Sequence, residues 1–368
     1  MDFELDDDQR ELQDTVRGIV DKECSPSFVR SVIDDGIDPA GWWATMVELY
    51  WPALAIAEDH GGLGMGWMEL AILLEELGRA TDPSPFVATT TQFTPAIAHC
   101  GDAAQQARWL EGVAAGSITG ALALGADTVT AEATDGGWRL NGSVRHVVDG
   151  DRADEIAVVA TVMDENGDGA QAVFVVERTI AGLTAERTPT FDYVAHIADV
   201  TLHDMAVAAD RRLAAVDVAG GVERTVAEAT LGWAIPTVGA CQRILDMTVA
   251  YVKERHQFGV PIGSFQAVKH KAVDMYVAVE RARAVCQYAA LVLAEGDPAW
   301  RTAVSMAKAA AGACQQVAIG NGIQLFGGIG FTWENDLQIS VRRAKLGEVM
   351  FGSAVEHRRR LGQEALAS

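Results

Sequence analysis

The sequence is poor in positive charge, because 29 lysines and arginines face 51 aspartates and glutamates and leave a net charge of −22 at pH 7. An acidic surface repels phosphate, so this balance disfavours nucleic acid and anionic membranes as partners. Long apolar runs are also missing, so we expect no membrane span, although 49% of the residues are hydrophobic and a globular fold is expected. The start of the chain lacks the basic and apolar regions of a secretory signal peptide.

Cysteine is scarce as well, and its few positions are scattered, odd in number and never spaced as C-x-x-C. This pattern argues against a disulfide framework and against a zinc or other metal site. It favours buried free thiols in a reducing compartment, so we expect a cytoplasmic protein. The cysteines are Cys24, Cys100, Cys241, Cys286 and Cys314.

The texture of the sequence changes twice along its 368 residues, a length that allows two or three domains. Apolar residues recur at helical spacing over residues 1–117, as in the row from Leu70 to Leu77. Short alternating segments separated by turns, such as residues 164–167, predict an antiparallel β domain over residues 118–213. Residues 214–368 are helical again, so the fold class expected is α+β with several domains.

The last third contains four helical segments, near residues 220–255, 265–295, 298–325 and 335–365. Four such segments joined by short connections are typical of a four-helix bundle. Pro236 lies inside the first segment and is expected to kink it, because proline removes a backbone donor and clashes with the preceding turn.

A glycine-rich stretch, Gln324–Glu334, follows the third of these segments and has glycine at three of four positions from Gly327. Glycine permits close approach of a ligand to the backbone, and the next helix directs N–H groups toward this turn. The alternative is a helix C-cap followed by a tight loop. The spacing does not match G-x-G-x-x-G after a strand, so a Rossmann site is not favoured.

The order of the three regions, together with several short motifs, resembles the acyl-CoA dehydrogenase family over nearly the whole chain. Each motif is weak alone, but their order and spacing together are specific. The matching motifs are Gly61–Gly64, Glu75–Gly78, Arg255–Gly259 with Phe265 and Gln266, Gln324–Gly330, and Arg342–Leu346.

The resemblance implies a three-domain subunit that binds FAD and assembles as a dimer of dimers. In that family a glutamate removes the α-proton of an acyl-CoA thioester, a hydride leaves the β-carbon for the flavin, and electrons pass to an electron-transfer flavoprotein. Such chemistry needs a base within reach and fixed donors on the thioester oxygen.

The resemblance also implies that each FAD lies across a subunit interface, and the residues that it assigns to a neighbour's cofactor are present in this sequence. Arg255 is expected to pair with the pyrophosphate, because its planar fork suits phosphate, and Phe258 is expected to pack on the cofactor. The expected cofactor-binding residues are Arg255, Phe258, Phe265, Gln266, Gln324, Gly327, Gly328 and Ser353.

The segments that hold a subunit's own flavin ring depart from the family pattern. Leu122–Thr128 stands where the family has T-E-P-x-x-G-S-D, and His146–Asp149 replaces W-I-T-N. Val148 thereby replaces a hydroxyl and cannot donate a hydrogen bond. His146 is a possible catalytic residue, although a single histidine in a strand is more often structural.

The catalytic base is also absent from its usual positions. Phe351 stands where the family has glutamate, and Ala229 stands at the position that some members use on the first bundle helix. Glu228 is next to it, but one residue along a helix rotates a side chain by about 100°. Glu228 therefore needs a shift of register to serve, which Pro236 makes conceivable.

The resulting hypothesis is a non-catalytic subunit of a heterotetrameric acyl-CoA dehydrogenase, which completes the FAD site of a catalytic partner chain. The resemblance implies bulky acyl-CoA substrates, including steroid side chains, bound mainly by the partner. One alternative is a homomeric dehydrogenase with a relocated base, Glu228 or Asp149. Another is a scaffold protein that keeps the fold without flavin.

Overall fold

The computed structural model describes residues 5–163 and 169–367, so the turn expected at residues 164–167 lies outside the described residues. The chain divides into two compact units. Unit 1 comprises the chain up to Ile37, Gly66–Pro83 and the chain from Thr230 onward, and unit 2 comprises Asp38–Met65 and Ser84–Ala229. The three-domain borders at residues 117 and 213 stay a prediction.

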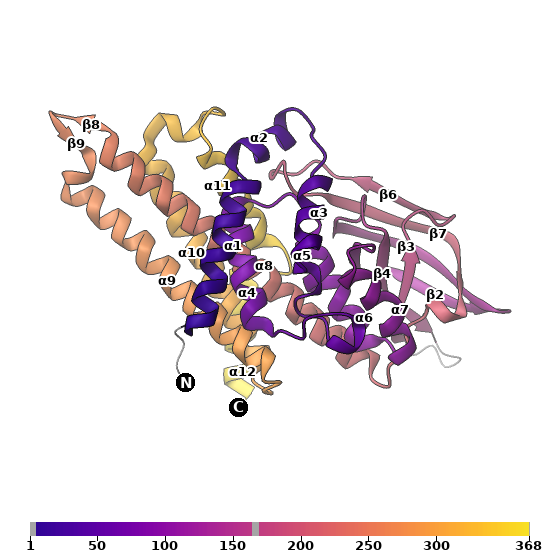
Figure 1. Ribbon diagram of the computed structural model, residues 1–368. Helices are drawn as coiled ribbons and strands as arrows, with labels where there is room; N and C mark the ends of the chain where they lie inside the picture. The colour runs from indigo at the N-terminus through magenta and orange to yellow at the C-terminus, as the bar shows by residue number, and fades with distance from the viewer. Residues whose placement is uncertain (1–4, 164–168, 368) are drawn as a thin grey trace. The chain divides into compact units, whose positions relative to one another are not determined.

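Unit 1 is helical, and its long helices correspond to the four predicted segments (Figure 1). The fourth segment is two helices, because Phe351 and Gly352 have φ of 55° and 96°, which ends one helix before the next begins. The expected helical bundle is confirmed with this division. The helices are α1 (Asp7–Glu23), α2 (Pro26–Asp34), α4 (Trp67–Ala80), the later part of α8 (Val218–Glu254), α9 (Gln266–Ala294), α10 (Trp300–Phe326), α11 (Leu337–Val349) and α12 (Ala354–Ala367).

Helices α4 and α8 approach each other closely in unit 1 because glycine stands at their crossing. A Cβ atom on Gly78 would lie 2.3 Å from the carbonyl oxygen of Pro236, and one on Gly239 would lie 2.0 Å from that of Glu75. Helix α8 continues through Pro236, and the expected kink stays a prediction.

Unit 2 contains a seven-stranded sheet in the order β1-β4-β2-β3-β7-β6, with β5 paired to β4. Most pairs are antiparallel as expected, but β1 and β2 both run parallel to β4, so the sheet is mixed. The strands are β1 (Gly120–Leu124), β2 (Val129–Thr134), β3 (Gly137–Val148), β4 (Glu155–Met163), β5 (Gly169–Glu177), β6 (Leu183–Arg187) and β7 (Ile197–Ala208).

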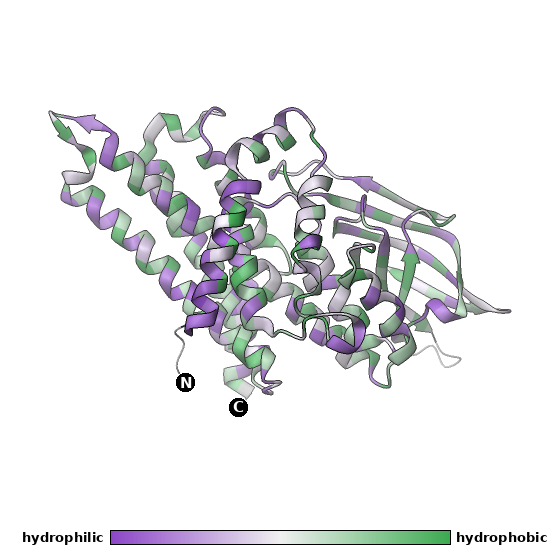
Figure 2. Ribbon diagram, viewed as in Figure 1, coloured by the Kyte–Doolittle hydropathy of each residue, from purple (hydrophilic) through white to green (hydrophobic). Residues whose placement is uncertain are grey.

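The two faces of this sheet bury separate apolar clusters, as the alternation of side chains along a strand requires. Figure 2 shows hydrophobic and hydrophilic residues alternating along the long strands. One cluster is made by the strands themselves around Phe174 and Leu140. The other joins Leu122 and Val175 to helical residues such as Phe93 and Trp109. Helices of unit 2 are α3 (Ala40–Glu48), α5 (Phe86–Ala88), α6 (Thr94–Cys100), α7 (Ala103–Ala114) and the beginning of α8, and a π-helical turn covers Thr89–Phe93.

Among the described helices, none has both the length and the apolar character needed to cross a membrane. The five cysteines are all buried and unpaired, as expected.

Candidate functional site

Arg255 follows the last residue of α8 and opens a β-hairpin made by β8 (His256–Gln257) and β9 (Val260–Pro261). Its N–H donates to the carbonyl of Tyr251 at 2.9 Å, and its carbonyl accepts the N–H of Ile262 at 2.8 Å. Its exposed guanidinium has no partner among the described residues. Figure 1 shows this hairpin at the end of α8 and the beginning of α9.

The tip of the hairpin presents Phe258 outward. Phe258 and Gly259 both have positive φ, 54° and 82°, between the paired residues Gln257 and Val260. Positive φ at both central residues defines a type I′ turn, which suits asparagine and glycine and strains an aromatic residue. The Phe258 side chain is 92% exposed and meets the edge of Phe265, at 6.2 Å between ring centroids. A strained, exposed aromatic residue indicates a functional position.

The glycine-rich turn at the end of α10 leaves its backbone open. Gly327 has φ 65° and ψ −144°, a combination that only glycine adopts readily. The backbone conformation alone therefore explains why glycine stands at this position. Gly328 has no positive φ, and a Cβ atom there would meet nothing within 4 Å. Because the chain itself does not require glycine at Gly328, close approach of a ligand is a natural explanation.

The hairpin and the glycine-rich turn come together in unit 1. The rings of Tyr251, one turn before Arg255, and Phe326, next to Gly327, stack with centroids 4.4 Å apart. Lys271 on α9 donates to the side chain of Asn321 on α10 at 3.1 Å. These contacts tie the end of α8, the start of α9 and the end of α10, which carry the predicted residues. Phe265, Gln266 and Gln324 are exposed in the same elements.

The segment around Arg255 is locally basic, although the whole chain has a net charge of −22. Between residues 253 and 271 four cations face one glutamate, which gives a local charge of +3. The cations are Lys253, Arg255, Lys269 and Lys271. Such a charge attracts a phosphate-bearing ligand.

Ser353 has a role inside its own chain. Its hydroxyl donates to Glu356 at 2.9 Å, and the same carboxylate accepts the N–H of Ser353 at 2.7 Å, which caps the start of α12. A cofactor contact by the Ser353 hydroxyl would compete with this cap. The contact stays a prediction.

The loop at the usual base position holds Phe351 half-buried with φ 55°. Nε2 of the buried His357 lies 3.0 Å from the carbonyl oxygen of Phe351. Lys308, 1% exposed, donates to the carbonyl of Gly347 at the end of α11. Glu348 accepts the N–H of Ala354 at 3.3 Å. These ionisable side chains hold the loop in place.

The second possible base position, Ala229, is fully buried, and its neighbour Glu228 is engaged elsewhere in unit 2. Glu228 lies 2.9 Å from Nε2 of His99 and 2.8 Å from Nε of Arg224. Burial alone raises the pKa of Glu228, but hydrogen bonds and charges from His99 and Arg224 outweigh it and lower the pKa. A carboxylate with a lowered pKa is a weaker base.

The segment where the family pattern fails is irregular. His146 is exposed at φ 62°, in a break of register between Val144 and Val147. Its N–H donates to Asp199 at 3.2 Å, and this fits a bulge position rather than a regular strand. Asp149 is buried and bonded to Arg152 at 2.7 Å, and burial raises its pKa despite that arginine.

Comparison with known proteins agrees with these motifs. Residues 6–117 match the acyl-CoA dehydrogenase N-terminal domain, and residues 222–366 match the acyl-CoA dehydrogenase C-terminal domain. The acyl-CoA dehydrogenase IpdE2 of Mycobacterium tuberculosis is 32% identical over 98% of both chains. The chain belongs to the acyl-CoA dehydrogenase family. Members of this family are oxidoreductases that act on acyl-CoA.

Two solved structures extend the family comparison to the fold. A chain of the ChsE4–ChsE5 complex from Mycobacterium tuberculosis is 28% identical, with a TM-score of 0.91 over 100% of both chains. A glutaryl-coenzyme A dehydrogenase in complex with glutaryl-CoA is 25% identical, with a TM-score of 0.92 over 100% of this chain and 97% of that one. The chain therefore has the acyl-CoA dehydrogenase fold.

Sequence reasoning missed the side chains that hold the loop around Phe351. Lys308 lies in the Ala-rich sequence of α10. A lysine on an otherwise apolar helix face is a pattern that would have indicated a buried ionisable group. It also missed the lysines near Arg255, which a count of charge within short windows would have found.

Proposed function

We propose that this chain is the non-catalytic subunit of a heteromeric acyl-CoA dehydrogenase and completes the FAD site of a catalytic partner chain. The observation that carries the proposal is the strained Phe258, which is held 92% exposed at the tip of the hairpin that Arg255 opens. Within residues 5–163 and 169–367 the guanidinium has no hydrogen-bond or ion-pair partner, and Phe258 contacts the edge of Phe265, so both groups are suited to a neighbour.

The residues of the hairpin and the glycine-rich turn fit a dinucleotide. Arg255 supplies a planar fork for phosphate oxygens, the surrounding charge of +3 attracts the pyrophosphate, and the open backbone at Gly328 admits a flat base or ribose. Exposed amides at Gln266 and Gln324 add donors and acceptors. When bound, FAD would accept the hydride from the β-carbon of the acyl group.

The non-catalytic role rests on the base positions. Phe351 and Ala229 cannot take a proton, and Glu228 is bound by His99 and Arg224. The chain lacks the catalytic base but keeps the residues that would bind a neighbour's FAD. This combination favours a complex in which a second chain carries out the catalysis. The similarity to a chain from a complex of two named components, ChsE4 and ChsE5, supports such an assembly.

The finer points of the proposal follow from the family resemblance. The partner would supply the base and most of the acyl-CoA site, and the reduced flavin would pass electrons to an electron-transfer flavoprotein. The substrate class proposed is a bulky acyl-CoA, including steroid side chains.

The decisive experiment is the flavin content of the chain alone and of the chain co-purified with candidate catalytic subunits. We expect a colourless, inactive chain when it is alone and one FAD per two chains in an active complex. A chain that is yellow when purified alone, with one FAD per chain and acyl-CoA oxidation, would rule the proposal out.

Substitutions in the complex test which residues serve the cofactor. Arg255→Gln removes the phosphate contact and should weaken FAD binding about tenfold or more, since hydrogen bonds to charged groups contribute about 1.5–3 kcal/mol. Arg358→Gln removes an exposed arginine from α12 and is the matched control. FAD affinity is measured by fluorescence titration of the stripped complex. Equal affinity in both variants would contradict the role given to Arg255.

A further inference from the structure

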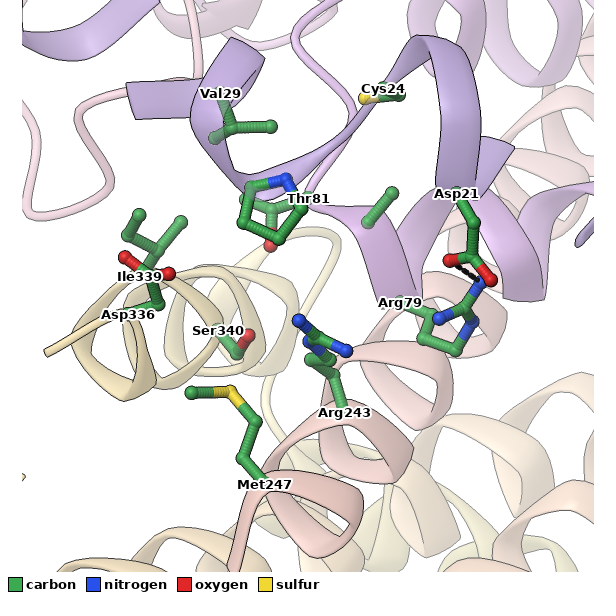
Figure 3. Close-up of a pocket in the computed structure, with 12 residues that line it drawn as sticks. Asp21, Cys24, Val29, Arg79, Thr81, Arg243, Met247, Asp336, Ile339 and Ser340 are labelled. Atoms are coloured by element: carbon green, nitrogen blue, oxygen red, sulfur yellow. Dashed lines mark hydrogen bonds and ion pairs between the residues drawn. The ribbon is translucent and has the colours of Figure 1, made fainter. Parts of the chain in front are cut away.

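A small pocket in unit 1 is lined by none of the cofactor-binding residues proposed above (Figure 3). Residues of α1, α2, α4, α8 and α11, or of their ends, line this pocket, and its volume is about 40 Å³. A water molecule needs roughly 10–15 Å³ on this measure, so the pocket has room for a few waters or one small ion. It is lined by Asp21, Cys24, Pro26, Val29, Arg79, Ala80, Thr81, Arg243, Met247, Asp336, Ile339 and Ser340.

The guanidinium of Arg243 is the uncommitted charge of this pocket. Figure 3 shows its side chain pointing from α8 into the space that Thr81 and Ser340 border. The Arg243 side chain makes no hydrogen bond or ion pair with any other residue in the described part of the chain. The other arginine of the pocket, Arg79, is engaged by Asp21 at 2.6 Å and by Glu76 at 2.7 Å.

Two hydroxyl groups border the pocket and are equally uncommitted. Thr81 ends α4 and is 1% exposed, and Ser340 lies in the first turns of α11 and is 4% exposed. Neither side chain has a hydrogen-bond partner within residues 5–163 and 169–367. A buried hydroxyl without a partner is unfavourable unless something else bonds to it. In Figure 3 both oxygens point toward the space that the Arg243 guanidinium enters.

The acidic groups of the pocket do not neutralise Arg243. Asp21 is bonded to Arg79, and Asp336 is bonded to Arg30 at 2.9 Å. Burial strongly raises the pKa of the Cys24 thiol, and Asp82 adds to the shift, so the thiol stays neutral. The pocket therefore has one free cation and two free hydroxyls, while each carboxylate is held by another arginine.

We propose that this pocket binds a phosphate group. A guanidinium donates two parallel N–H groups to two oxygens of a phosphate, and the two hydroxyls donate to the remaining oxygens. The volume accepts one tetrahedral oxyanion and excludes a whole nucleotide, whose remainder would extend outward. The group comes either from free inorganic phosphate or from a phosphate monoester. The inference does not depend on the proposed subunit role.

The test is isothermal titration of the full chain with inorganic phosphate in a phosphate-free buffer, at ionic strength held constant with chloride. We expect saturable binding to the wild-type chain at one site. Arg243→Gln should weaken binding about tenfold or more, because a charge-assisted contact is lost. Arg243→Lys keeps the charge without the fork and should bind with intermediate affinity.

Two further variants keep the test decisive if Arg243→Gln does not fold. Ser340→Ala removes one hydroxyl and should weaken phosphate binding severalfold. Arg281→Gln removes an exposed arginine on α9 and should leave it unchanged. No saturable phosphate binding to the wild type, or an equal loss in Arg281→Gln, would overturn the proposal.

Adenosine 3′-monophosphate separates the two sources. Competition between this monoester and inorganic phosphate for the same Arg243-dependent site would support a ligand-borne phosphate. Binding of inorganic phosphate without competition by the monoester would support the free ion.

Discussion

At the scale of single residues, Lys308 is the most unusual group in unit 1. It is 1% exposed and donates to the carbonyl of Gly347, so its charge lies in a protein interior. Burial lowers its pKa from the ordinary 10.5 to about 7, although Glu348 opposes the shift. The cost of burying an ammonium is avoided when the group loses its proton.

The lowered pKa of Lys308 predicts that stability rises with pH. The unfolded chain keeps this proton up to about pH 10.5, whereas the folded chain releases it near pH 7, so the unfolded state binds more protons between these values. The free energy of unfolding should increase by at most about 1.4 kcal/mol per pH unit from this group. Lys308→Met should remove that slope, and the exposed-site control Lys269→Met should keep it. The free energy of unfolding is measured by urea denaturation between about pH 7 and pH 9. If it changes with pH equally in wild type and in Lys308→Met, the lowered pKa of Lys308 is refuted.

At the scale of elements, the crossing of α4 and α8 depends on missing side chains. Gly78 and Gly239 bring each helix against the backbone of the other, with a built Cβ only 2.3 Å and 2.0 Å from carbonyl oxygens. Backbone atoms cannot move aside as a flexible side chain does, so the two helices would have to separate. The ion pairs of Glu75 with Arg283 and of Glu76 with Arg17 border the same crossing.

Substitution at this crossing should destabilise the chain. We expect Gly78→Ala to lower the free energy of unfolding by about 3 kcal/mol, at the upper end of the cost of overpacking. Gly320→Ala is the matched control, because it lies in α10 with nothing within 4 Å of the added Cβ. There alanine should raise stability by about 0.5–1 kcal/mol through its better helix propensity. Urea denaturation measures both, and an unchanged midpoint for Gly78→Ala would disprove the close crossing.

At the scale of the whole molecule, charge is distributed unevenly. The chain has a net charge of −22, yet residues 253–271 have a local charge of +3 around Arg255. An acidic chain as a whole repels a dinucleotide, so a basic end is needed to capture one. This contrast supports the assignment of the cofactor contact to the hairpin and its surroundings.

The uneven charge predicts salt-sensitive cofactor binding in the complex. The affinity for FAD should fall severalfold between about 0.05 M and about 0.5 M NaCl, because screening shortens the reach of the basic groups. The complex that contains Arg255→Gln should depend on salt less steeply. Fluorescence titration across the salt series measures both slopes. Identical slopes would mean that Arg255 and its neighbours do not attract the cofactor.

Local features were predicted well because their cause lies within a few residues. The row from Leu70 to Leu77 predicts a helix and lies in α4, since apolar spacing decides which face is buried. The break in the last helix was missed because Phe351 adopts positive φ, which phenylalanine rarely does. The parallel pairing of β1 with β4 was missed as well, because alternation shows that a strand exists but not which strand it joins.

The sequence by itself determined the family, the kinds of elements and the two motifs that form the hairpin and the glycine-rich turn, because short spacing and residue type encode them. Only the tertiary structure decided that Glu228 is bound by His99, that Tyr251 stacks on Phe326, and that Arg243 enters a pocket beside Ser340. These contacts join residues distant in the chain, so they form only when the helices pack and bury them.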